Sequence, residues 1–85
     1  MTEQNFIVAS VIQKLIKLIE EHGESNRFFT SDFGPHISPL QVAMVFTKHA
    51  NRVDSDPRLA NLRIVYCPRK NAANPAMILV SKKAG

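Results

Sequence analysis

The chain has 85 residues, which is enough for one compact domain. Its 45% apolar and 21% charged residues are typical of globular domains and exclude a disordered tail, a collagen-like repeat or a coiled-coil rod. The net charge of +4 is uneven, because residues 1–35 carry three basic and five acidic side chains whereas residues 36–85 carry eight basic and two acidic ones. We therefore expect a single domain over 1–85, with flexible ends at 1–5 and 82–85. Its basic half either meets a polyanion or merely keeps the domain soluble.

The first predicted element is a helix that begins near Asn5 and ends at Gly23, where a positive φ is expected. Its polar residues fall at 10, 13, 14, 17, 20 and 21, which is one narrow stripe at helical spacing. A core-facing stripe of Val8, Ile12, Leu15 and Ile19 would leave a second apolar stripe of Ile7, Val11 and Leu18. This wide apolar arc fits either a helix wedged between two layers of its own domain or a two-fold homodimer seam along the second stripe.

The middle of the chain predicts a short extended segment and two helices. Residues 27–30 include two adjacent phenylalanines and are expected to form a single β-bridge segment. The segment 31–36 begins like a capped helix, but Gly34-Pro35 ends it within about a turn. Ser38-Pro39-Leu40-Gln41 then places serine at the N-cap, proline at the first helical position and glutamine three residues after the cap. This pattern predicts a capping box and a helix that runs to about Asn51 or Arg52.

The last third of the chain predicts a β-hairpin. Asp56-Pro57 is expected to cap one more helical turn. Residues 62–67 and 76–80 are rich in β-formers, and the polar loop 68–75 that joins them begins and ends in proline. Two such strands favour an antiparallel pair.

This order of elements resembles the winged helix-turn-helix family of DNA-binding domains. The resemblance is carried by Thr30-Ser31-Asp32, by the segment from Ile37 to Ala43 and by the hairpin at 62–81. It implies an α+β fold of three helices with a C-terminal β-hairpin wing, and double-stranded DNA as the partner of a small transcriptional regulator. The sequence departs from the family where Gly34-Pro35 interrupts the second helix, and the recognition face carries no arginine before Arg52.

By this resemblance, helix 38–52 enters the major groove. The groove-facing residues that it implies are Ser38, Pro39, Gln41, Met44, Thr47 and Lys48. Gln41 would pair with adenine unless the capping box uses its side chain, and Thr47 would contact a thymine methyl or a phosphate. Lys48 and Arg52 suit phosphates, although both also fit an ordinary solvated helix face.

The wing at 68–75 would lie on the DNA backbone, because paired basic residues on a projecting hairpin neutralise phosphates. The residues implied for its tip are Arg69, Lys70 and Asn71. The alternative function is a winged-helix module that binds another protein. The wide apolar face of the first helix favours this alternative, whereas the basic balance of 36–85 favours DNA.

No residue pattern in the chain predicts catalysis, a cofactor or a metal. His22, His36, His49 and Cys67 match no metal-ligand spacing, and phosphate-loop, nucleophile-elbow and dinucleotide motifs are absent from the sequence. A lone cysteine and a polar, acidic start give no sign of an oxidising compartment or a signal peptide. The apolar stretch 6–19 is too short and too polar to span a membrane. We therefore expect a cytoplasmic, non-enzymatic protein.

Overall fold

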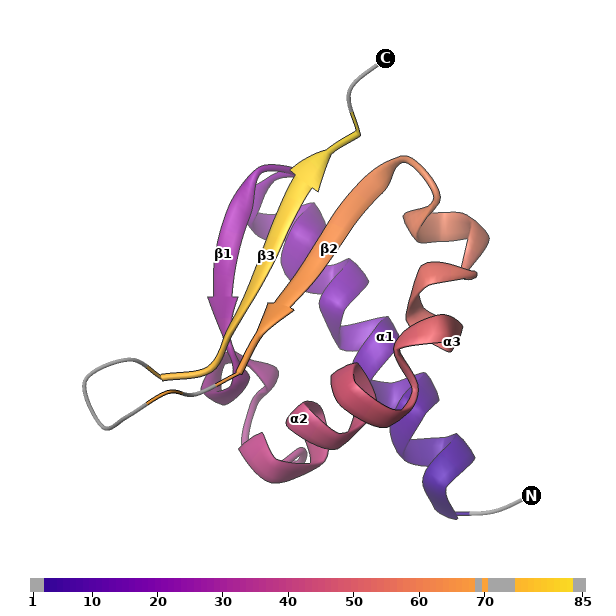
Figure 1. Ribbon diagram of the computed structural model, residues 1–85, viewed down its shortest axis with the longest axis vertical. Helices are drawn as coiled ribbons and strands as arrows, with labels where there is room; N and C mark the ends of the chain where they lie inside the picture. The colour runs from indigo at the N-terminus through magenta and orange to yellow at the C-terminus, as the bar shows by residue number, and fades with distance from the viewer. Residues whose placement is uncertain (1–2, 69, 71–74, 84–85) are drawn as a thin grey trace.

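The computed structural model describes residues 3–68, 70 and 75–83. In this part of the chain lie three α-helices and three strands (Figure 1). The helices are α1 (Glu3–His22), α2 (Pro39–Lys48) and α3 (Ala50–Asp54), and the strands are β1 (Asn26–Phe29), β2 (Leu62–Cys67) and β3 (Met77–Lys82). Two short 3-10 helices, η1 (Thr30–Phe33) and η2 (Pro57–Leu59), complete the α+β fold. Regular structure thus takes in residues 3–5 and Lys82, further towards both ends than the sequence indicates.

The three strands form an antiparallel sheet in the order β1-β3-β2. The predicted hairpin is confirmed, with Tyr66 of β2 opposite Ile78 of β3. On the other side of β3, Phe28 of β1 also faces Ile78. The segment expected to form only a bridge is therefore a four-residue strand, and β3 becomes the central strand of the sheet.

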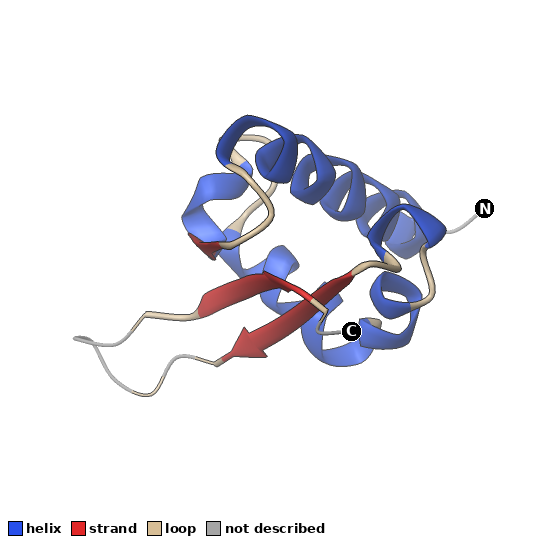
Figure 2. Ribbon diagram, turned by 90° about the horizontal axis from the view of Figure 1, so that it is seen from above, coloured by secondary structure: helices blue, strands red, loops and turns tan. Residues whose placement is uncertain are grey.

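α1 crosses behind the sheet and covers one of its faces (Figures 1 and 2). Alternate strand residues point toward it, because successive side chains of a strand face opposite sides. They join one buried cluster with the apolar side of α1 and with η1, α2 and α3. Its members are Val8, Val11, Ile12, Leu15, Leu18, Ile19, Phe28, Phe33, Val42, Val45, Phe46, Val53, Leu59, Leu62, Ile78 and Val80.

The second stripe predicted on α1 is not an exposed seam. Val11 is 0% and Leu18 is 6% exposed, so both belong to the core of their own domain, and Ile7 packs against that core as a partly buried residue. The reason is that α1 contacts α2 and η1 as well as sharing the core with the sheet, so one domain uses nearly the whole apolar arc. The homodimer interface predicted through Ile7, Val11 and Leu18 is therefore wrong at Val11 and Leu18, because both are buried within their own domain.

Two helix ends show how local sequence sets the fold. α1 stops as predicted at Gly23, which has φ 100° and donates its N–H to the carbonyl of Ile19 (2.7 Å). The helix predicted over 38–52 is instead divided at His49, whose φ of −123° and ψ of 26° are not helical. Arg52 consequently lies on α3 and not on α2. No helix within the described residues is long and apolar enough to cross a bilayer.

Candidate nucleic-acid interface

A complete capping box fixes the start of α2. The backbone N–H of Gln41 donates to Ser38 Oγ (3.2 Å), and the N–H of Ser38 donates to Gln41 Oε1 (3.0 Å). Pro39 occupies the first turn, where its missing N–H costs nothing. The sequence prediction of this cap is confirmed. Because the cap engages the amide oxygen of Gln41 and holds its side chain over the first turn, a two-bond contact with an adenine would compete with the cap.

The hydroxyl of Thr47 is also used within the helix. Its Oγ1 donates to the backbone carbonyl of Ala43 (2.8 Å) and approaches that of Met44 at 3.2 Å. Bonds of this kind are common for threonine inside helices. The side chain is exposed, so Thr47 can still offer a partner its methyl group and the lone pairs of its oxygen, but not its hydroxyl hydrogen. In each of the two residues predicted to read bases, Gln41 and Thr47, one side-chain polar atom is therefore already hydrogen-bonded within α2.

The outward face of α2 is largely apolar. Leu40 is 81% exposed, Ala43 and Met44 are half-buried, and Thr47 is exposed. Positions 40, 43, 44 and 47 repeat at the spacing of one helix face, and with Gln41 and Lys48 they line a shallow surface groove. The opposite face supplies Val42, Val45 and Phe46 to the core. Sequence reasoning included Met44 and Thr47 in the site but missed Leu40 and Ala43, although their spacing to these residues is visible in the sequence.

Three aromatic rings hold α2 against the rest of the domain. Phe46 of α2 meets Phe33 of η1 edge to face, with ring centroids 6.2 Å apart, and stacks on Tyr66 of β2 with centroids 5.9 Å apart. Such pairs contribute about 0.5–1.5 kcal/mol beyond the area that they bury. Burial raises the pKa of the Tyr66 phenol. The Phe46–Tyr66 contact places α2 beside the end of β2 that leads into the hairpin loop (Figure 1).

The hairpin carries the remaining predicted contacts. Lys70, in the loop between β2 and β3, is exposed. Arg69 and Asn71, the other two residues predicted at the tip, lie outside the described residues. Lys48 at the end of α2 is exposed as well, so cations occur on both elements of the candidate interface.

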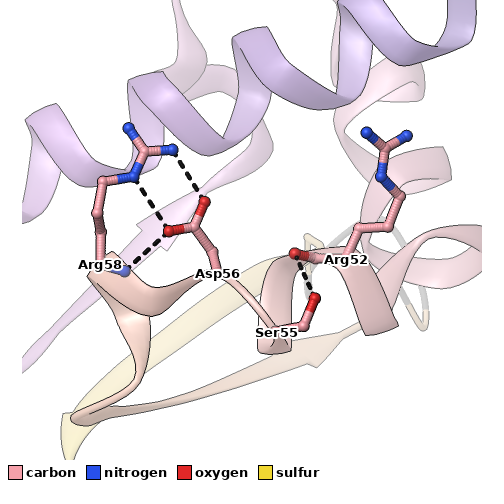
Figure 3. Close-up of polar contacts among 4 residues, drawn as sticks. All are labelled: Arg52, Ser55, Asp56 and Arg58. Atoms are coloured by element: carbon pink, nitrogen blue, oxygen red, sulfur yellow. Dashed lines mark hydrogen bonds and ion pairs between the residues drawn. The ribbon is translucent and has the colours of Figure 1, made fainter.

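The turn after α3 holds one carboxylate and one guanidinium in a fixed pair (Figure 3). Arg58 donates from Nε to Asp56 Oδ1 (3.0 Å), from Nη2 to Oδ2 (2.9 Å) and from its backbone N–H to Oδ1 (2.9 Å). These hydrogen bonds hold the pKa of Asp56 below its usual range. Asp56 also caps η2, as the Asp56-Pro57 pattern predicted. Arg58 therefore balances one of the two acidic residues of the basic half.

Arg52 lies on the preceding helix, where its side chain is exposed and its backbone carbonyl accepts from the hydroxyl of Ser55 at 3.4 Å (Figure 3). The structure thus distributes the predicted cations Lys48, Arg52 and Lys70 over α2, α3 and the hairpin loop.

Three of the five acidic side chains of the first half gather at the end of α1. Glu20 and Glu21 lie in the last turn of α1, and Glu24 follows it, where Lys82 approaches its carboxylate at 3.8 Å. The end of α1 lies at the opposite end of the molecule from α2 (Figure 1). Glu20, Glu21 and Glu24 therefore lie away from the outward face of α2, whereas Asp32 belongs to η1, which packs against α2.

Among the described residues, no group of three or more His, Cys, Asp and Glu side chains is placed to hold a metal ion. Comparisons of the chain with protein-family models, with curated proteins and with solved structures found no match.

Proposed function

We propose that the protein is a winged-helix-like module that binds duplex DNA through α2 and the β2–β3 hairpin, as a small regulator of transcription does. The observation that carries the proposal is the packing of Phe46 on Tyr66, which sets an exposed helix and a basic hairpin side by side at one end of the molecule. An α-helix fits the major groove, and an adjacent β-ribbon can then follow the backbone.

Charge supports a nucleic acid as the partner. Exposed cations on three separate elements, at Lys48, Arg52 and Lys70, give phosphate contacts that do not depend on base sequence. Of the two acidic residues of the basic half, Asp56 adds little repulsion, because it is paired with Arg58. We expect about four to six phosphate contacts, which corresponds to a slope of log affinity against log salt of roughly −4 to −5.

The test is a titration of a short labelled duplex with the protein, followed by fluorescence anisotropy over a series of salt concentrations. The variant Lys48→Gln/Lys70→Gln should bind every duplex more weakly and reduce the slope by about two, since each lost phosphate contact reduces it by about one. The matched control is Lys17→Gln, because Lys17 is an exposed lysine on α1. If Lys17→Gln loses as much affinity as the double variant Lys48→Gln/Lys70→Gln, the assignment of the interface to α2 and the hairpin is refuted.

A second function is favoured by one observation, the 81% exposure of Leu40 on an apolar helix face. Large exposed apolar side chains are typical of surfaces that bind proteins. A protein-binding module of this kind would show no duplex binding even at low salt, or binding with a slope near zero. Either result would replace the DNA proposal with this one.

A further inference from the structure

The outward face of α2 suggests which base pairs it contacts. We infer that this face recognises the 5-methyl groups of thymine in the major groove, through Leu40, Ala43, Met44 and the methyl group of Thr47. The inference rests on the proposed DNA-binding function and names the substrate class of the same site: duplexes that carry thymine methyl groups where α2 lies.

The hydrogen bonds of α2 reduce the polar groups that its outward face can offer to a base. Gln41 Oε1 accepts from the N–H of Ser38 (3.0 Å), and Thr47 Oγ1 donates to the carbonyl of Ala43 (2.8 Å). Residues 39–48 contain no arginine, the residue that makes the commonest specific contact with guanine. Lys48 stands at the end of the helix, where it suits a phosphate. The largest part of the outward face is then the set of methyl and methylene groups of Leu40, Ala43, Met44 and Thr47.

The chemistry of the major groove gives these groups a matching surface. Each thymine places a 5-methyl group there, and small apolar side chains contact it, whereas unmodified cytosine has no such group. Positions 40, 43, 44 and 47 of α2 lie on one face, so a helix in the groove presents all four together. Contact with thymine methyl groups would bury Leu40, which otherwise leaves 81% of its surface in water.

The electrostatics identify DNA as the occupant of this apolar face. Exposed Lys48 borders the groove formed by Leu40, Met44 and Thr47. Of the eight basic side chains of residues 36–85, Arg58 and Lys82 are paired with Asp56 and Glu24 away from this face. The acidic end of α1 lies at the far end of the molecule (Figure 1). A polyanion that carries apolar groups in its groove matches both properties of the surface.

The experiment compares a duplex of alternating adenine and thymine with the same duplex in which uracil replaces every thymine. Uracil lacks only the 5-methyl group and keeps the same hydrogen-bonding edge. We expect affinity to fall by about fourfold for each methyl group contacted. A duplex of alternating guanine and cytosine should in turn bind more tightly when 5-methylcytosine replaces cytosine, because that methyl group occupies the same ring position.

Two variants show whether α2 is the source of the preference. Leu40→Ala should bind the thymine duplex more weakly and lose most of its discrimination against uracil. Leu79→Ala serves as the control, because Leu79 is also an exposed leucine, 38% exposed, but lies on β3. It should keep the full thymine preference. Circular dichroism should show both variants folded, since neither side chain belongs to the buried core.

The outcomes separate the inference from the function on which it rests. Equal, salt-dependent binding of the thymine and uracil duplexes would overturn the inference and leave the DNA-binding proposal standing. A thymine preference that Leu40→Ala retains would also overturn it, because the methyl groups would then be read by another part of the protein. Failure to bind any duplex at low salt would overturn both.

Discussion

Replacing the two residues of the capping box tests whether Gln41 reads bases or only supports the start of α2. The variants are Ser38→Ala, Gln41→Ala and the double variant. In the structure each residue accepts one hydrogen bond from the backbone of the other, at 3.2 Å and 3.0 Å. Loss of the Ser38 hydroxyl should lower the free energy of unfolding by about 1 kcal/mol, within the range measured for such caps. Gln41→Ala should cost about 0.5–1 kcal/mol, since an exposed hydrogen bond contributes modestly.

Thermal unfolding followed by circular dichroism measures these changes. In a domain of this size a loss of 1 kcal/mol lowers Tm by roughly 4–8 °C. Because the two bonds close one reciprocal motif, the effects of the single substitutions should not add in full. The loss of unfolding free energy in the double variant should therefore be smaller than the sum of the two single losses, by about 0.5 kcal/mol or more.

The DNA-binding measurement distinguishes capping from base reading. If Gln41 acts through the cap, Gln41→Ala and Ser38→Ala should weaken binding to different duplexes by similar factors and leave the order of sequence preference unchanged. A change of preference in Gln41→Ala that Ser38→Ala does not share would refute this reasoning, because it would show a direct contact between the Gln41 amide and a base worth about 1–3 kcal/mol.

Two further predictions concern the core and the Asp56–Arg58 pair. Val11→Glu should abolish the cooperative thermal transition, because Val11 is 0% exposed and an isolated buried charge is strongly unfavourable, while Gln13→Glu at an exposed position of α1 should remain folded. A folded, monomeric Val11→Glu protein would restore the dimer interpretation. Since the folded-state pKa of Asp56 is lowered, its stabilising effect is present above the unfolded-state pKa and disappears as pH falls. Asp56→Asn should therefore lose less stability than the parent between neutral and strongly acidic pH. Equal losses in the two proteins would contradict this assignment.

The elements set by local interactions could be predicted from the sequence. The Ser38–Gln41 box, the stop at Gly23 and the Asp56-Pro57 cap each depend on a few neighbouring residues, and each lies where the pattern indicated. The β2–β3 hairpin was predictable for a related reason, since two strand-forming runs are joined by a polar loop that begins and ends in proline.

The features that the sequence did not predict depend on contacts between distant segments. β1 forms a strand because β3, about fifty residues later, offers it an edge, with Phe28 opposite Ile78. Val11 and Leu18 are buried because several elements surround α1, and no periodicity within the helix reveals how many neighbours it has. The break between α2 and α3 at His49 was not predictable either, because no proline or glycine near His49 marks it in the sequence. Apolar patterning predicts that a side chain will be covered, but it does not identify what covers it.

The candidate site was only partly predictable because two tasks select the same residue types. Serine, threonine and glutamine near the start of a helix can cap or stabilise it, and the same side chains can read bases. The structure separates the tasks, because an atom already engaged in the helix, such as Gln41 Oε1 or Thr47 Oγ1, is not offered to a partner in full. Leu40 has neither of these structural roles. It makes no cap, it leaves 81% of its surface in water, and the core is complete without it. We therefore propose that a partner covers Leu40, and the exposed lysines Lys48 and Lys70 agree with the duplex DNA proposed above.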